Sequence, residues 1–117
     1  MPQVSIITPT YNCARFIEET IKSVQAQTFT DWEMIISDDC SSDNTKEVIA
    51  PYLASDSRIK YICNDKNSGA AITRNNALRI ASGRWIAFLD SDDLWLPEKL
   101  EKQISFMIEN GINFSYT

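Results

Sequence analysis

Three carboxylates follow an apolar run in the second half of the chain. The run Trp85–Leu89 is typical of a strand buried on both faces, and Asp90, Asp92 and Asp93 come directly after it. Carboxylates this close together repel one another and resist removal from water. Mg²⁺ or Mn²⁺ would relieve the repulsion, because both ions prefer oxygen ligands. The spacing therefore predicts a metal site that could hold a phosphorylated ligand.

Two further polar groups stand where other predicted strands end. Thr8–Asn12 follows a short β-rich run, and Asp38 and Asp39 follow a second one. The carboxyl ends of parallel strands lie at one edge of a sheet, where the ligands of open α/β folds bind. We therefore expect the three groups to converge on one site.

Several of these residues also have a plainer structural interpretation. Asp and Asn are favoured helix N-caps, so we expect Asp93 to cap the helix that follows it and Asn12 to begin the first helix. We expect Trp85 and Trp95 to pack in the core.

Strand and helix patterns alternate along the chain. They predict strands at 3–8, 32–37, 59–63 and 84–89, helices at 14–27, 41–54, 70–81 and 97–110, and the start of a fifth strand at 112–116. Such alternation predicts an α/β fold with a mostly parallel sheet, right-handed crossovers and helices on both faces. We interpret residues 1–117 as one domain, and the incomplete fifth strand indicates part of a longer one.

Local signals predict where the helices begin and end. Asn44 and Glu47 have capping-box spacing at the start of the second helix. Pro51 is expected to end or kink that helix, and Ser82–Gly83 to close the third.

The composition excludes several functional classes. The chain has 117 residues, is 44% hydrophobic and carries a net charge of −5, which argues against nucleic-acid binding. With three cysteines and no histidine, a Cys/His or Cys₄ zinc site is excluded, and reduced thiols of a cytoplasmic protein are expected. We expect no signal peptide, because Met1 leads directly into the first predicted strand, and no apolar segment approaches the ~18 residues of a membrane span.

The motifs, taken together, closely resemble those of the family 2 glycosyltransferases. The matching segments are Val4–Asn12, Ile35–Thr45, Asn67–Gly69, Thr73–Asn75 and Phe88–Asp93. The resemblance covers the amino-terminal, nucleotide-binding part of that family's catalytic domain. It implies a GT-A, Rossmann-like fold, truncated at the carboxyl terminus. It also implies transfer of a sugar, with inversion, from a nucleotide diphosphate donor, for which UDP is favoured, to a glycan or lipid-linked acceptor in polysaccharide assembly.

The resemblance also implies how the donor's base would be bound. Tyr11 would stack on or beside the base, and Asp39 would accept a hydrogen bond from it. Thr8 and Pro9 would shape that pocket, and Arg74 would face the base or the diphosphate.

The resemblance also implies that Asp90 and Asp92 form an Asp-x-Asp (DXD) metal motif. Asp92 would be the direct ligand of Mg²⁺ or Mn²⁺, with Asp90 also at the metal and nearer the ribose. Inverting transfer needs a general base. No residue here matches the family's base, so we expect it beyond Thr117, and this chain to bind donor without efficient turnover.

The resemblance also bears on the partners and the location of the protein. We expect a cytoplasmic protein that acts on a saccharide or lipid-linked acceptor and associates peripherally with the inner face of the membrane, and oligomeric state is left open. Two alternatives remain. A phospho-acceptor receiver domain has a similar length and acidic pocket, although its acidic pair would follow the first strand, where Thr8–Thr10 stands. A non-catalytic binding module could also keep the fold.

Overall fold

The computed structural model describes residues 2–110 and shows alternating strands and helices. The elements are β1 (Val4–Thr10), α1 (Ile17–Gln25), β2 (Trp32–Asp38), α2 (Thr45–Ser55), β3 (Ile59–Cys63), α3 (Ala70–Ile80), β4 (Trp85–Phe88) and α4 (Lys99–Asn110). The predicted α/β alternation is confirmed. The expected fifth strand at 112–116, and Gly111 before it, lie outside the described residues.

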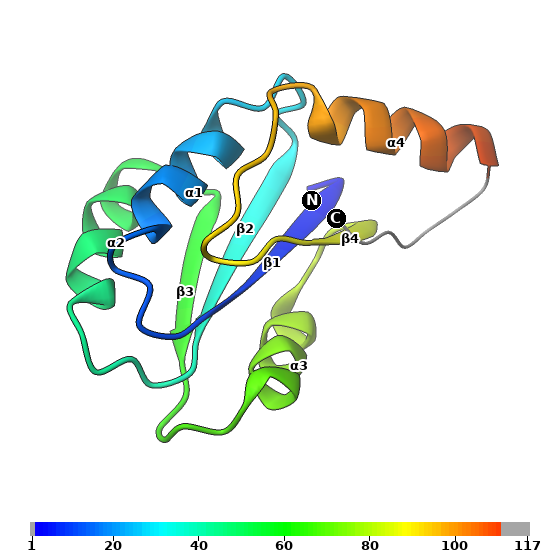
Figure 1. Cartoon of the computed structure of the whole chain (residues 1–117). Helices are drawn as coiled ribbons and strands as arrows, with labels where there is room; N and C mark the ends of the chain where they lie inside the picture. The colour runs from blue at the N-terminus through cyan, green and yellow to red at the C-terminus, as the bar shows by residue number, and fades with distance from the viewer. Residues whose placement is uncertain (1, 111–117) are drawn as a thin grey trace.

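The described strands form one parallel sheet in the order β3-β2-β1-β4 (Figure 1). From β1 the chain builds outward through β2 to β3, and then crosses to the other side of β1 to form β4. The direction of winding therefore reverses between β1 and β4. A crevice opens at such a switch point because the loops that leave the two strands diverge.

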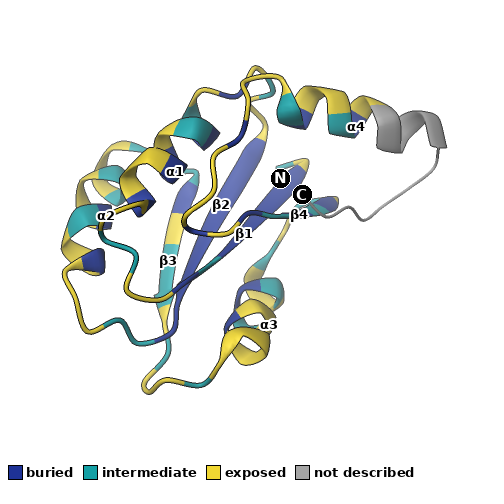
Figure 2. Ribbon diagram, viewed as in Figure 1, coloured by how far each residue is buried: buried dark blue, intermediate teal, exposed yellow. Residues whose placement is uncertain are grey.

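Helices cover both faces of the sheet, as predicted. Ile6 of β1 faces a large apolar cluster that includes Ile21 of α1 and Ile49 of α2. Its neighbour Ile7 faces a smaller cluster with Ala77 of α3 on the opposite face. Figure 2 shows the central strands buried between these layers and the outer surface of α3 exposed. Side chains alternate along a strand, so consecutive isoleucines serve both layers.

The edge strand β4 differs from the expectation of burial on both faces. Trp85 and Ala87 are buried, whereas Ile86 and Phe88 are only partly covered. Among the described helices, α3 covers that face, and it packs mainly over β1 and β2. Only one face of β4 is therefore fully covered.

Strand β1 is longer than predicted and runs through Pro9. Ile7 accepts a hydrogen bond from the Leu89 N–H on the β4 side, and the pairing with β4 stops there. Backbone N–H and C=O groups of alternate residues point to the same side of a strand, so the nitrogen of Pro9 faces the β4 side, like Ile7. At Pro9 no β4 residue pairs with β1 any longer. The missing N–H of proline therefore costs the sheet no hydrogen bond.

Several predicted helix ends are wrong. Helix α2 ends at Ser55, within one residue of the expected end, but it begins at Thr45 rather than at residue 41 and continues through Pro51, so the proline does not end it. Pro51 and Glu47 are exposed, and water can therefore satisfy the Glu47 carbonyl that proline leaves without an N–H partner. The Asn44–Glu47 capping box does not form, because the Asn44 side chain makes no cap bond. The Asp43 carboxylate accepts the Thr45 N–H instead.

The other end signals also have a different physical origin. Helix α1 begins at Ile17 rather than near residue 14, since a turn at Cys13 precedes it. Helix α3 ends at Ile80, and Gly83 lies beyond its cap. A Cβ atom at Gly83 would stand 2.5 Å from the Ser5 nitrogen, so close approach to β1 explains this glycine.

Candidate functional site

A cavity of about 400 Å³ opens at the carboxyl edge of the sheet. Its lining comes from the ends of β1 and β2, the start of α3 and the loop after β4: Pro9, Thr10, Tyr11, Cys13, Asp39, Asn67, Ala70, Thr73, Arg74, Asp90, Ser91 and Asp92. The cavity thus combines residues from both sides of the switch point between β1 and β4. The three polar groups expected to converge do so.

Six of the seven residues predicted for the site line this cavity, namely Pro9, Tyr11, Asp39, Arg74, Asp90 and Asp92. Thr8 is absent from the lining. It is fully buried in β1, and its hydroxyl has no hydrogen-bond partner among the described residues. Thr8 is therefore not part of the cavity wall, although its neighbour Pro9 is.

Asp39 supplies a buried anion to the cavity wall, with only 7% of the residue exposed. Its Oδ1 accepts the Ser68 N–H at 2.6 Å and an Asn64 amide N–H at 2.9 Å, and its Oδ2 accepts the Gly69 N–H at 3.0 Å. Burial acts to raise the pKa of Asp39, but these donors outweigh burial and lower the pKa below its usual value. The side chain is therefore an ionised acceptor, and Oδ2 keeps room for a further donor.

The carboxylate of Asp39 also shapes the start of α3. Gly69 stands at the helix N-cap with φ +93°, a conformation that favours glycine. Because Asp39 accepts the Ser68 and Gly69 N–H groups, it orients the start of the helix that carries Arg74. The amide of Asn64 completes this arrangement, since it also donates to Thr73 and accepts from Asn76. Sequence patterns identify Asn64 only as part of a polar loop.

Asn12 positions the loop that carries Tyr11 and does not begin the first helix. It has φ +50°, and its side-chain oxygen accepts the N–H groups of Ser42 and Asp43. Its own N–H donates to Ser41 Oγ at 2.8 Å. These bonds tie the loop after β1 to the loop after β2, and Tyr11 is left half exposed at the cavity mouth.

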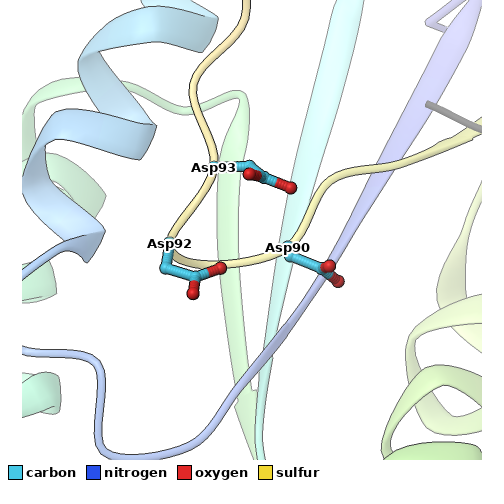
Figure 3. A group of neighbouring side chains, drawn as sticks. All are labelled: Asp90, Asp92 and Asp93. Carbon is cyan, nitrogen blue, oxygen red and sulfur yellow. The ribbon is translucent and has the colours of Figure 1, made fainter.

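The acidic cluster lies on the loop after β4 (Figure 3). One carboxylate oxygen from each of Asp90, Asp92 and Asp93 lies within 4.8 Å of the others, and all three residues are exposed. Among the side chains that the structure describes, none forms an ion pair with them. Three hard oxygen donors without a protein cation fit a divalent ion of the Mg²⁺ or Mn²⁺ type.

Asp93 is not the cap that its spacing predicted. Helix α4 begins only at Lys99, and Asp93 instead belongs to the acidic cluster. The intervening loop accounts for the difference, because it packs along α1 before α4 starts. Figure 1 shows this path from β4 back across the sheet.

A larger cavity of about 710 Å³ lies between this loop and α4. Leu94, Trp95 and Leu96 make much of its wall apolar, and Lys99 and Lys102 stand at its side. Burial lowers the pKa of Lys99. Only Asp93 joins this cavity to the acidic cluster, so the smaller cavity contains the convergent polar chemistry.

Comparison with known proteins agrees with the geometry of this edge. Residues 5–116 match the family model for glycosyl transferase family 2. The chain is 53% identical, over 97% of its length, to the Escherichia coli UDP-Glc:α-D-GlcNAc-diphosphoundecaprenol β-1,3-glucosyltransferase WfgD. It is 48% identical over its whole length to WfaP, an E. coli glucosyltransferase with the same description. It covers 44% and 46% of these two proteins, and so spans less than half of their length.

Solved structures show the same fold. S. aureus TarS 1–349 in complex with UDP-GlcNAc matches with a TM-score of 0.87 and 34% identity over 95% of this chain and 32% of TarS. The Pyrobaculum calidifontis mannosyltransferase PcManGT, in complex with GDP-Man and Mn²⁺, matches with a TM-score of 0.85 and 27% identity over 91% of this chain and 32% of PcManGT. These matches confirm the expected GT-A fold and do not favour a receiver domain.

The described residues contain no helix long and apolar enough to cross a membrane. The match over nearly the whole chain, the shared fold and the polar cavity at the switch point lead to one conclusion: the chain belongs to glycosyltransferase family 2.

Proposed function

We propose that residues 1–117 form the donor-binding portion of an inverting, metal-dependent glycosyltransferase that uses a UDP-sugar. The observation that carries the proposal is the convergence of Tyr11, Asp39, Arg74 and the acidic cluster on one cavity. The relatives named for UDP-glucose and the TarS complex with UDP-GlcNAc support the choice of uridine.

Asp39 is the residue that we propose selects the base. The imide N–H of uracil needs an acceptor, and the ionised carboxylate offers only acceptors. Cytosine presents an acceptor at the same ring position, so its ring nitrogen and the carboxylate would repel each other. The half-exposed ring of Tyr11 would contact the face of the base, and Pro9 would fill the pocket beside it.

We propose that Asp90 and Asp92 hold the divalent ion, and that Arg74 faces the diphosphate from α3. When bound, such an ion supplies Lewis-acid stabilisation of the charge that develops on the departing diphosphate. Without it, the carboxylates of Asp90 and Asp92 on the cavity wall, with Asp93 beside them, would repel the donor. Nucleotide binding should therefore depend on metal.

We assign no residue of this chain as the general base, and expect that group beyond Thr117. A lipid-linked saccharide acceptor, as in the names of WfgD and WfaP, would require the protein to work at a membrane surface. We propose peripheral association with the cytoplasmic face for that reason.

Calorimetry of UDP binding with and without Mn²⁺ tests the proposal. We expect Mn²⁺ to strengthen UDP binding by about tenfold or more, or about 1.4 kcal/mol. Asp92→Asn should abolish the difference. Asp31→Asn is the matched control, because Asp31 is also exposed but lines a cavity with Glu33 and Lys60 at the amino edge of the sheet. Equal UDP affinity with and without Mn²⁺ in the unmodified chain would exclude the proposed metal role.

A further inference from the structure

One face of α1 and its end carries polar side chains directed at the loop after β4. Thr20, Ser23 and Gln27 recur at i, i+3 and i+7, and we call them the polar stripe. Thr20 is fully buried and Gln27 is 3% exposed, although neither belongs to the apolar clusters on the sheet. Buried polar side chains are retained where they satisfy specific partners.

Thr20 contacts the backbone on both sides of Asp92. Its hydroxyl lies 2.8 Å from the Ser91 carbonyl oxygen and 2.9 Å from the Asp93 carbonyl oxygen. The hydroxyl also lies 3.3 Å from the Phe16 carbonyl oxygen of its own helix. Because a hydroxyl has one proton, the three carbonyls share a single donor, and the two loop carbonyls are the nearer acceptors. The hydroxyl therefore pins the two residues that flank the proposed metal ligand.

The rest of the polar stripe holds the same loop further along. The Trp95 N–H donates to Ser23 Oγ at 3.3 Å. The Gln27 side chain donates to the Leu96 carbonyl at 2.8 Å and accepts the Leu100 N–H at 3.0 Å. Between Phe88 and Lys99 the loop has no helix or strand of its own, so these side chains replace a regular hydrogen-bond ladder.

The loop needs such support because of its charge. The clustered carboxylates repel one another, and a loop that could relax would spread them apart. If the fold already holds the carboxylates together, a cation can bind without first overcoming their repulsion. Residues that support the metal ligands have this role in other metal sites.

We propose that Thr20 is a positioning residue for the acidic cluster, acting through the backbone carbonyls of Ser91 and Asp93 to set metal affinity. This inference rests on the proposed function. Thr20 contacts no ligand itself, and its effect should appear in metal binding and not in metal-free nucleotide binding.

The test compares Thr20→Val, which removes the hydroxyl at nearly constant shape, with the unmodified chain. Mn²⁺ affinity is measured by electron paramagnetic resonance in the presence of UDP, and UDP affinity by calorimetry without metal. We expect Thr20→Val to weaken Mn²⁺ binding by about tenfold, as for other residues that support metal ligands. Metal-free UDP affinity should change by less than about twofold, well under the tenfold that corresponds to 1.4 kcal/mol.

Thr28→Val is the matched control. Thr28 contacts the same loop further on, at Pro97, and also contacts Glu101. This variant should keep the Mn²⁺ affinity of the unmodified chain. If Thr20→Val fails to fold, the pair Thr20→Ser and Thr20→Ala isolates the hydroxyl at similar size, and only the serine variant should retain Mn²⁺ binding.

The outcomes separate the two proposals. Metal-dependent UDP binding that survives Thr20→Val unchanged would overturn the positioning role alone, as would equal losses of metal-free and metal-dependent UDP binding. Absence of metal dependence in the unmodified chain would overturn both.

Discussion

The carboxylates at the two ends of the sheet differ in burial and in their hydrogen-bond and ionic partners. At the amino edge, the Glu33 side chain is buried, and both of its oxygens have partners: Lys60 Nζ lies 2.7 Å from Oε1, and Ser5 Oγ and the Ser82 N–H bind Oε2. At the carboxyl edge, Asp90, Asp92 and Asp93 are exposed and have no cationic partner among the described side chains.

The difference separates a carboxylate that serves the fold from carboxylates available to a ligand. Glu33 joins β1, β2, β3 and the connection before β4. Burial acts to raise the pKa of Glu33, but Lys60, Ser5 and Ser82 together lower it to about 2. Asp39 shares features of both groups, since it orients the start of α3 and still faces the cavity.

The largest effect should follow from Glu33→Gln at the amino edge. The substitution leaves Lys60 without its anion and sets an amide N–H against the donors of Ser5 and Ser82. Lowering of the pKa from 4.5 to about 2 corresponds to about 3 kcal/mol of stability, and we expect a loss of that order. Urea denaturation measures it, with exposed Glu19→Gln as the control. A loss below about 0.5 kcal/mol, the range of ordinary surface substitutions, would contradict the role of Glu33.

Acid should lower the stability that the Glu33 carboxylate contributes. The folded-state pKa of Glu33 lies below its ordinary value, so its contribution is fully present above about pH 5 and is lost as the pH falls toward 2. Stability of the unmodified chain should therefore fall more steeply over this range than that of Glu33→Gln. Parallel pH profiles of the two proteins would show that Glu33 has no such linkage. Other acids with lowered pKa values, such as Asp56, contribute equally to both profiles.

The smallest effect on stability should follow from Asp93→Asn at the carboxyl edge. Unlike Glu33→Gln, this substitution should not lower stability. Removing one of three mutually repelling charges should leave stability unchanged or raise it by up to about 0.5 kcal/mol without metal. Added Mn²⁺ and UDP should raise the melting temperature of the unmodified chain more than that of the variant. Calorimetric melting curves with and without these ligands provide the measurement. Destabilisation by more than about 1 kcal/mol would mean that Asp93 supports the fold.

Sequence reasoning succeeded where periodicity or strand ends carry the information. The alternation of strands and helices predicted the parallel sheet, and the strand ends at Thr10, Asp38 and Phe88 brought the polar groups to one edge. It failed where a side chain binds the backbone of a distant segment. Asn12 bonds to Ser42, and Asp93 lies in a loop held by α1.

The same physical reason explains the residues that sequence reasoning missed. Thr20 lies on α1 and Gln27 just after it, where only the apolar periodicity was visible, and their partners after β4 are backbone atoms 69 to 73 positions away. Glu33 lies beside the apolar run of β2, and its partners come from β1, β3 and the residues after α3. Spacing within one segment gives no information on such contacts.

The central claim is that metal and nucleotide meet at the carboxyl edge alone. Nuclear magnetic resonance of the chain with UDP tests it most directly, because bound Mn²⁺ broadens the signals of nearby nuclei. We expect substoichiometric Mn²⁺ to broaden the amide signals of Asp90, Asp92 and Tyr11 and to leave those of Glu33 and Lys60 sharp. Broadening centred on Glu33 and Lys60, or spread evenly over the chain, would contradict it.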